Sequence, residues 1–209
     1  QQLFRDLGVQ QIVSGGQTMN PSTEDILHAA EQVPAMDVYV LPNNKNIVMA
    51  AEQAARLART SGVRRIHVVP TTTIPQGISA MMAYDESAEI KDNVEAMQEA
   101  ASRVQSGSVT FAARDSDYDG HQIKEGELLA LENGKVAFTG TDLGSVTAKV
   151  AKDLMREDSQ FITLLYGADV SEEQAADVEE AVRSLLPEEV ELTVAYGGQP
   201  VYYFLISVE

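Results

Sequence analysis

Three short apolar runs in the first eighty residues are each followed by a small polar cluster and then by a stretch with helical spacing. The runs are residues 12–13, 38–41 and 66–69, and their clusters are residues 14–18, 42–46 and 70–73. If the runs are strands, this alternation predicts a parallel sheet with right-handed crossovers. The three clusters then lie together at the carboxyl edge of the sheet. Ligands and partners bind at that edge in α/β folds, because loop amides and helix amino termini converge there.

Helices are predicted between and after these runs. Residues 20–33 form the first helix, because Asn20 or Ser22 can cap it and its first turn is acidic. Residues 46–60 form the second, and its repeated alanines indicate close packing against the sheet. Two further helical stretches follow, one that ends at Tyr84 and one over residues 87–104.

A different pattern begins near Gly107. Strands are predicted there, including a hairpin turned by Asn133-Gly134, a pair that suits a two-residue turn. The predicted strands are residues 109–113, 128–131, 136–139, 161–166, 190–196 and 201–208, with helices at 143–155 and 172–186. We therefore expect an α/β chain of two domains, a parallel α/β domain over residues 1–106 and a mixed-sheet α/β domain over residues 107–209.

The chain carries 32 acidic and 15 basic residues, for a net charge of −17. This balance disfavours binding to nucleic acid or to anionic lipid, because both need clustered Lys and Arg. A basic protein partner would fit better, although the charge can also serve solubility alone. The absence of cysteine excludes disulfides, thiolate nucleophiles and cysteine-ligated metals.

No apolar run approaches the roughly 20 residues that cross a bilayer, and no basic-then-apolar leader precedes the first predicted strand. We therefore expect no membrane insertion, and a cytoplasmic location. The chain starts at Gln1 rather than Met. We expect it to be a piece of a longer polypeptide.

Catalytic and metal-binding patterns are weak. Residues 15–18 are glycine-rich but match no phosphate-binding fingerprint, so a tight turn is favoured over phosphate binding. Asp115, Asp117 and Asp119 begin like a calcium loop, but Gly126 stands where the bidentate Glu belongs, which favours a solvated acidic loop. The three histidines, at positions 28, 67 and 121, lack metal-ligand spacing. No serine is placed by the sequence near a histidine and an acid that could activate it as a nucleophile.

The cluster at residues 43–46 offers three asparagine amides and one lysine. An Asx turn that caps a helix and a binding role for a ligand or partner are about equally supported, since three polar clusters share one edge.

The strings at residues 12–23, 41–47 and 69–77 resemble the carboxy-terminal region of the bacterial fatty acid kinase catalytic subunits, the FakA or YloV family, and the resemblance extends over essentially the whole chain. It implies an upstream kinase domain, similar to the dihydroxyacetone kinase L subunit, that binds ATP and Mg. It also implies a homodimer of the full-length protein, and docking of FakB, the partner that carries the fatty acid to be phosphorylated.

This region is in turn similar to the two-domain DegV fold, whose first domain is Rossmann-like. In that family a fatty acid lies between two domains, its head group held by Ser and Thr of the first and by Arg and His motifs of the second. Residues 18–22 resemble the first-domain pattern, whereas residues 138–143 lack the Arg and residues 196–200 lack the His loop. A buried carboxylate would then lack partners, at a cost of several kcal/mol.

The sequence therefore predicts a non-catalytic docking module without its own metal or cofactor. The expected partner-binding residues are Asn43, Asn44, Lys45, Thr72 and Gln76, and the expected vestigial ligand rim is Gly16, Gln17, Thr18 and Ser22. Two other classes stay open: a DegV-like fatty-acid carrier, and a regulatory domain that binds a small molecule.

Overall fold

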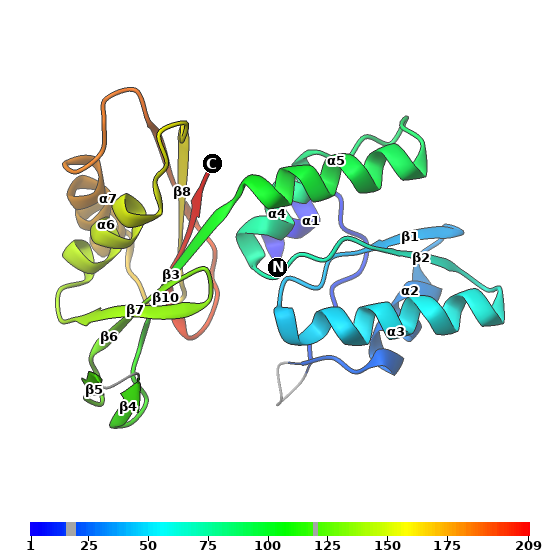
Figure 1. The fold of residues 1–209 in the computed structure, drawn as a ribbon, viewed down its shortest axis with the longest axis horizontal. Helices are drawn as coiled ribbons and strands as arrows, with labels where there is room; N and C mark the ends of the chain where they lie inside the picture. The colour runs from blue at the N-terminus through cyan, green and yellow to red at the C-terminus, as the bar shows by residue number, and fades with distance from the viewer. Residues whose placement is uncertain (16–19, 119–120) are drawn as a thin grey trace. The chain divides into compact units, whose positions relative to one another are not determined.

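The computed structural model describes residues 1–15, 20–118 and 121–209 of the chain (Figure 1). Contacts divide the chain into two compact units, Gln1–Arg103 and Val104–Glu209. We describe each unit by itself. Within the described residues, no helix has the length and apolar character that a membrane span requires.

The first unit contains a short parallel sheet between two pairs of helices (Figure 1). Its elements are α1 (Gln2–Asp6), α2 (Thr23–Gln32), β1 (Asp37–Val40), α3 (Lys45–Ser61), β2 (Arg65–Val68), α4 (Ile74–Met82) and α5 (Ile90–Arg103). Val38 and Ile66 pack with α2 and α3 on one face of the sheet. Tyr39 packs with α4 and α5 on the other face, around Met97. This alternation along each strand is what buries both faces.

The prediction of a strand at residues 12–13 is wrong. Residues 11–15 have no regular secondary structure, and the parallel sheet has two strands within the described residues. β1 and β2 each supply four residues to the pairing, whereas Ile12 and Val13 are two half-buried apolar residues beside polar and glycine positions. So short an apolar run buries too little surface to hold a strand in register.

The second unit has a six-stranded mixed sheet of order β7-β6-β3-β10-β8-β9, in which β8 and β9 are parallel and the other pairs are antiparallel. The strands are β3 (Gln105–Phe111), β6 (Leu128–Glu132), β7 (Lys135–Gly140), β8 (Phe161–Tyr166), β9 (Glu191–Tyr196) and β10 (Tyr202–Val208). Helices α6 (Leu143–Leu154) and α7 (Glu172–Arg183) contribute to one shared core with the sheet. The prediction of a mixed sheet is confirmed.

Gly107, where the sequence pattern changes, lies inside β3. A Cβ at this position would meet Val150 Cγ1 at 2.5 Å, so the glycine allows α6 to approach the strand closely.

The acidic segment after β3 forms a small hairpin, β4 (Ser116–Tyr118) with β5 (His121–Ile123), which the sequence analysis did not predict. The Asp115 carboxylate accepts a hydrogen bond from Glu125 N at 2.8 Å and pairs with Lys124 at 3.5 Å. Asp119 and Gly120, the other members of the calcium-like pattern, lie outside the described residues.

Candidate functional site

Two loops leave the carboxyl edge of β1 and β2, and hydrogen bonds between Asn43 and Thr71 tie them together. Asn43 N donates a hydrogen bond to Thr71 Oγ1 at 3.1 Å, and Thr71 Oγ1 donates to Asn43 Oδ1 at 2.8 Å. Asn43 has a φ of 55°, a left-handed conformation that asparagine tolerates better than most residues. Thr71 is 1% exposed. The two loops are therefore held in one arrangement by a buried, reciprocal bond.

Gly77 makes room for this pair. A Cβ on Gly77 would lie 2.0 Å from Asn43 Oδ1, so a side chain there would displace the asparagine. The first turn of α4 thus packs directly on the loop that follows β1.

The same loops cap the helices that follow them. The Asn44 side chain accepts a hydrogen bond from Asn46 N at 2.9 Å and begins α3. Thr73 caps α4, and Gln76 Oε1 accepts hydrogen bonds from Thr72 N at 2.8 Å and Thr72 Oγ1 at 2.9 Å. Both helix amino termini therefore begin at the carboxyl edge of the sheet, where the positive ends of helix dipoles favour anionic groups.

The structure gathers the predicted partner-binding residues at the starts of two helices on this edge. Asn43 and Asn44 are half-buried and serve the loops themselves. Lys45 and Thr72 are exposed, and Gln76 is half-buried. We call Lys45, Thr72 and Gln76 the rim. The sequence analysis missed Thr71, the residue that locks the loops, because nothing in the sequence distinguishes it from Thr72.

Ser22 of the predicted ligand rim caps α2 in a capping box. Ser22 N and Ser22 Oγ both donate to Asp25 Oδ2, at 2.8 and 2.7 Å, and Asp25 N donates to Ser22 Oγ at 3.1 Å. These bonds from Ser22 lower the pKa of Asp25. A carboxylate of the chain itself thus occupies the start of α2. Gly16, Gln17 and Thr18 lie outside the described residues.

The second unit repeats this arrangement at α6. Asp142 caps the helix, and its carboxylate accepts a hydrogen bond from Ser145 N at 2.8 Å. Hydrogen bonds from Ser145 lower the pKa of Asp142. An ionised aspartate therefore stands at the positive end of α6, next to the segment where the DegV-like pattern would place an arginine.

The loop at residues 197–200 is closed by its own glutamine. Gln199 Nε2 donates to Leu165 O at 2.8 Å and more weakly to Tyr202 O at 3.4 Å. The Gln199 carbonyl accepts a hydrogen bond from Ala168 N at 3.0 Å. The side-chain amide of Gln199, which could otherwise contact a ligand, is thus hydrogen-bonded to the backbone near the end of β8 and at the start of β10.

Charge is distributed unevenly along the chain. From β1 through α4, residues 37–84, the chain contains two acidic residues, Asp37 and Glu52. The same segment carries five basic residues: Lys45, Arg56, Arg59, Arg64 and Arg65. In addition, neither α3 nor α4 has an acidic residue in its first turn, whereas α2 and α7 each have two. Of the five basic residues, only Lys45 belongs to the rim, whereas Arg56 and Arg59 lie in the last turns of α3 and Arg65 begins β2. The rim therefore carries one exposed cation.

At the amino end of the same sheet, Asp37 joins β1 to β2. Its carboxylate accepts hydrogen bonds from Arg65 Nε at 2.7 Å and Arg65 Nη2 at 2.5 Å, and lies 2.9 Å from His67 Nε2. Arg65 and then His67 hold the pKa of this carboxyl well below its usual range. The Tyr39 ring lies between those of His67 and Tyr84, with centroids 5.6 and 5.5 Å away. Burial raises the pKa of Tyr39.

Solved structures that are similar to this chain define its fold class. A DegV family protein of Corynebacterium glutamicum matches with a TM-score of 0.64 and 14% identity, over 99% of this chain and 90% of that one. A Thermus thermophilus DegV family protein, described by its fatty acid binding, matches with a TM-score of 0.56 and 15% identity, over 90% and 77%. The chain has a DegV-like α/β fold, as predicted.

Dihydroxyacetone kinase from C. freundii, solved with AMP-PNP and Mg²⁺, also matches, with a TM-score of 0.69 and 16% identity. That match covers 91% of this chain and 42% of the kinase chain. At this identity the likeness concerns the fold alone.

Sequence comparison assigns the family. The model of the FakA-like C-terminal family, the carboxy-terminal region of FakA-like fatty acid kinase proteins, matches residues 1–209, and the chain belongs to this family. YloV of Bacillus subtilis is 40% identical over 207 residues, which are 99% of this chain and 36% of that protein. An uncharacterized protein of Staphylococcus haemolyticus is 43% identical over 208 residues, 100% of this chain and 37% of that protein. The chain thus spans little more than a third of these relatives.

Proposed function

We propose that this chain is the non-catalytic docking region of a fatty acid kinase, and that it binds the fatty-acid carrier FakB. The upstream kinase domain, with ATP and Mg, would then phosphorylate the carboxylate of the bound fatty acid for phospholipid synthesis. Docking turns the meeting of kinase and carrier into an effectively intramolecular event, which raises the local concentration of the substrate. A cytoplasmic location and a homodimer of the longer protein belong to the same proposal.

One observation carries the choice of docking over lipid carriage. At the start of α2, the Asp25 carboxylate accepts the hydrogen bonds of Ser22, a residue of the segment that resembles the DegV-like head-group pattern, and Asp142 lies in the segment that lacks the arginine of that pattern. Asp25 and Asp142 both have lowered pKa values, so both are negatively charged at neutral pH. A fatty-acid carboxylate would meet like charge at each position, and its desolvation would not be compensated.

The rim supports docking because its geometry is fixed before a partner arrives. The Asn43–Thr71 bond and the two helix caps hold the loops, so binding need not order them. Lys45 and Thr72 then present a cation and a hydroxyl to the outside.

The local charge changes one expectation. The net charge of −17 favours a basic partner, but the charged residue that a partner meets at the rim is Lys45, an exposed cation. We therefore propose that FakB presents an acidic surface to the rim.

Calorimetric titration of the chain with fatty-acid-loaded FakB tests this proposal. Lys45→Ala together with Gln76→Ala should weaken binding about tenfold, which corresponds to about 1.4 kcal/mol. Higher salt should weaken wild-type binding. Lys135→Ala removes an exposed lysine of β7 and is the matched control, which should bind as the wild type does. Equal affinity of the rim variant and the wild type would rule out docking at the rim.

Mass spectrometry of an organic-solvent extract separates docking from carriage. The purified chain should release no stoichiometric fatty acid. If it does release one equivalent, the chain is itself a carrier.

A further inference from the structure

The strand β2 has one edge paired with β1 and one edge without a strand. Arg65 N donates to Met36 O at 2.8 Å, and Val69 N donates to Val40 O at 3.0 Å. In a strand, alternate residues turn their backbone groups to the same side, so Arg65, His67 and Val69 face β1. Ile66 and Val68 therefore turn their N–H and C=O groups the other way. No third strand joins this sheet within residues 1–15, 20–118 and 121–209.

Figure 1 shows β2 between α3 below and α5 above, with no helix crossing in front of it. An open edge of this kind is a template for an added strand, since each unpaired N–H and C=O can bond to an extended backbone. Pro70 follows the strand and has no N–H, so the template is short. Side chains beside the edge must then supply part of the affinity.

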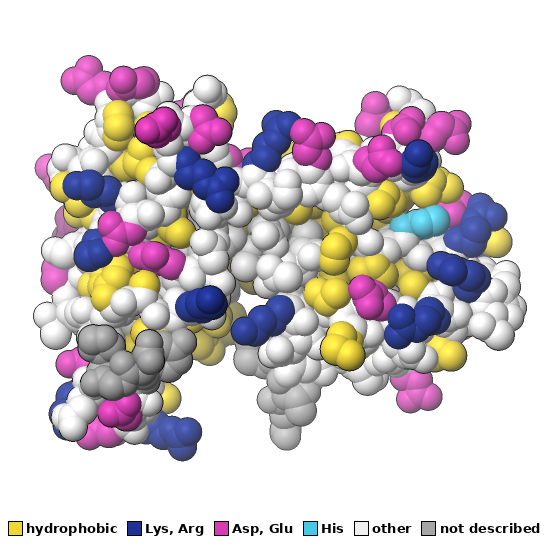
Figure 2. Space-filling model, in the orientation of Figure 1, with side chains coloured by type: hydrophobic (Ala, Val, Ile, Leu, Met, Phe, Trp, Pro, Cys, Tyr) yellow, Lys and Arg dark blue, Asp and Glu magenta, His cyan; other side chains and the backbone are white. Residues whose placement is uncertain are grey.

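Those side chains are basic. Ala51, Ala54 and Ala58 mark the buried face of α3, and the bond from Thr23 Oγ1 to Ala50 O marks the flank beside α2. At 100° per residue, the opposite flank of α3 and its outer face carry one acid, Glu52, and three cations: Lys45, Arg56 and Arg59. All three are exposed, and no carboxylate in the described part of the chain forms an ion pair with them. Figure 2 shows several Lys and Arg side chains spread over the region of α3 and β2, with an acidic side chain among them.

The two arginines that precede and begin β2 are engaged elsewhere. Arg64 Nη2 donates to Glu31 O and Val33 O, both at 3.1 Å, so its guanidinium holds the end of α2. Arg65 pairs with Asp37. On α3, Arg56 donates hydrogen bonds from Nε and Nη2 to Gln53 Oε1, a neutral acceptor, so its charge is not compensated there. The charges of Lys45, Arg56 and Arg59 therefore remain for a partner.

We propose that the open edge of β2, flanked by Lys45, Arg56 and Arg59, binds an extended acidic segment of a partner protein as an added strand. The backbone groups of Ile66 and Val68 supply the register, and the cations of α3 select for acidic side chains. A second copy of the chain is disfavoured as the occupant, because pairing two β2 edges would bring two sets of these cations together. This proposal does not depend on the assignment of FakB to the rim.

Backbone NMR with a synthetic peptide tests the proposal. The probe is a peptide of about eight residues, the length of an ordinary strand, in which Glu and Val alternate. It should shift the amide signals of Ile66 and Val68 and bind less tightly as salt rises. A peptide that alternates Lys and Val should leave both signals in place.

Two variants address the two parts of the site. Val68→Pro removes one outward N–H and leaves the pairing with β1 in place. It should weaken binding of the Glu-Val peptide about tenfold, as expected for the loss of one backbone hydrogen bond. Arg56→Glu with Arg59→Glu should weaken it at least as much and abolish the salt dependence. Arg114→Glu with Arg156→Glu makes the same charge change in the second unit and should have no effect.

Several outcomes would overturn the proposal. One is that the Glu-Val peptide binds Val68→Pro, and also Arg56→Glu with Arg59→Glu, as tightly as it binds the wild type. Another is equal binding of the Lys-Val peptide. A third is that a DNA duplex or phosphatidylserine vesicles shift the same amide signals while the Glu-Val peptide does not. Self-association of the chain through Ile66 and Val68, seen as concentration-dependent shifts, would show a second copy to be the occupant. If FakB does not bind at the rim, the results expected here for the peptide are still the same.

Discussion

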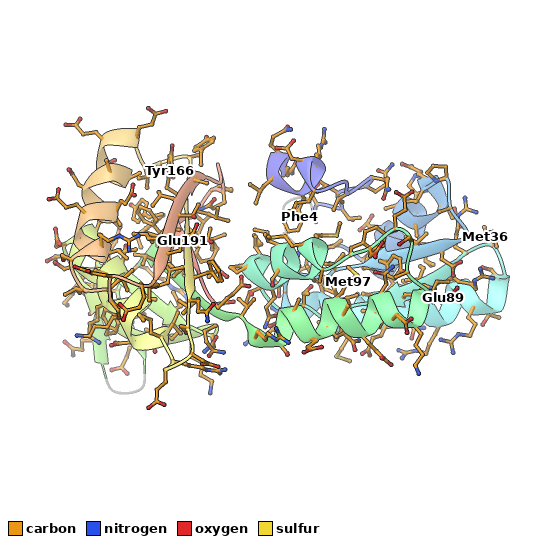
Figure 3. All side chains as sticks on the ribbon, turned by 90° about the horizontal axis from the view of Figure 1, so that it is seen from above. Phe4, Met36, Glu89, Met97, Tyr166 and Glu191 are labelled. Atoms are coloured by element: carbon orange, nitrogen blue, oxygen red, sulfur yellow. The ribbon has the colours of Figure 1, made fainter. Side chains whose placement is uncertain are left out.

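Among the described residues of Val104–Glu209, eighteen buried apolar side chains form one core between the sheet and two helices. In Gln1–Arg103, the buried residues divide into a cluster of nine on one side of the sheet and a cluster of four on the other. The first unit therefore depends more on local bonds such as the Asn43–Thr71 pair. Both proposed binding surfaces lie on the part of the chain with the smaller cores, and the rim follows the general tendency of recognition to sit on loops. Figure 3 shows the side chains of both units, with Met97 labelled in the first and Tyr166 in the second.

Removing a large side chain from the core of the second unit should have the largest effect. Phe204 is 0% exposed, and Phe204→Ala should destabilise the protein by about 3–5 kcal/mol. Hydrogen exchange should show lost protection across β3, β8 and β10, which neighbour this residue in the sheet. If protection from hydrogen exchange in β1 and β2 falls by the same amount, the two units do not have separate cores of different strength.

The loop lock should matter nearly as much in the first unit. Asn43→Ala removes the side-chain acceptor of the buried Thr71 hydroxyl, keeps the backbone bond from residue 43 N to Thr71 Oγ1, and places alanine at a φ of 55°. We expect a loss of about 2–3 kcal/mol, measured as faster exchange in β1 and β2. Asn133→Ala is the matched comparison, because Asn133 also has positive φ and bonds to Ser106 N, but is exposed. An equal loss in both variants would refute the special role of the lock.

The helices of the chain and the polar clusters at the carboxyl edge follow from local sequence, since periodic alanines and capping residues act within one turn. The lock itself does not. Asn43 and Thr71 are 28 residues apart, and their bond depends on the register between β1 and β2. The Asp37–Arg65–His67 cluster was missed for the same reason.

The strand order of the second unit was likewise beyond local reasoning. The last strand, β10, lies between β3 and β8, so two long-range pairings decide the topology. Conversely, residues 12–13 have a local strand pattern and yet form no strand, because no pairing holds so short a run.

Equivalent helix caps in the two units sharpen the comparison further. Ser22 and Ser171 each form a capping box, at the starts of α2 and α7. Ser22→Ala and Ser171→Ala should each cost about 1 kcal/mol. Exchange should accelerate throughout the first unit for Ser22→Ala, whereas for Ser171→Ala it should accelerate in α7 alone. Global loosening in both variants would contradict the difference in core size.

Acid should weaken the first unit through Asp37, with the smallest effect. The pKa of Asp37 is lowered in the folded state from the ordinary value of 3.8, chiefly by hydrogen bonds from Arg65 and then from His67. A lowered folded pKa means that the charged carboxylate stabilises the fold at any pH above about 4, and that this contribution is lost as the pH falls further. Because Arg65 is largely exposed, solvent screens the pair and keeps its contribution small.

Asp37→Asn should therefore unfold in urea at a lower midpoint than the wild type at pH 7, and the two midpoints should converge as the pH is taken below 4. Asp115→Asn is the control in the second unit, where Glu125 N is the main cause of the lowered pKa. A gap for Asp37→Asn that stays constant from pH 7 to the acid limit would show that the ion pair does not join the two strands in solution.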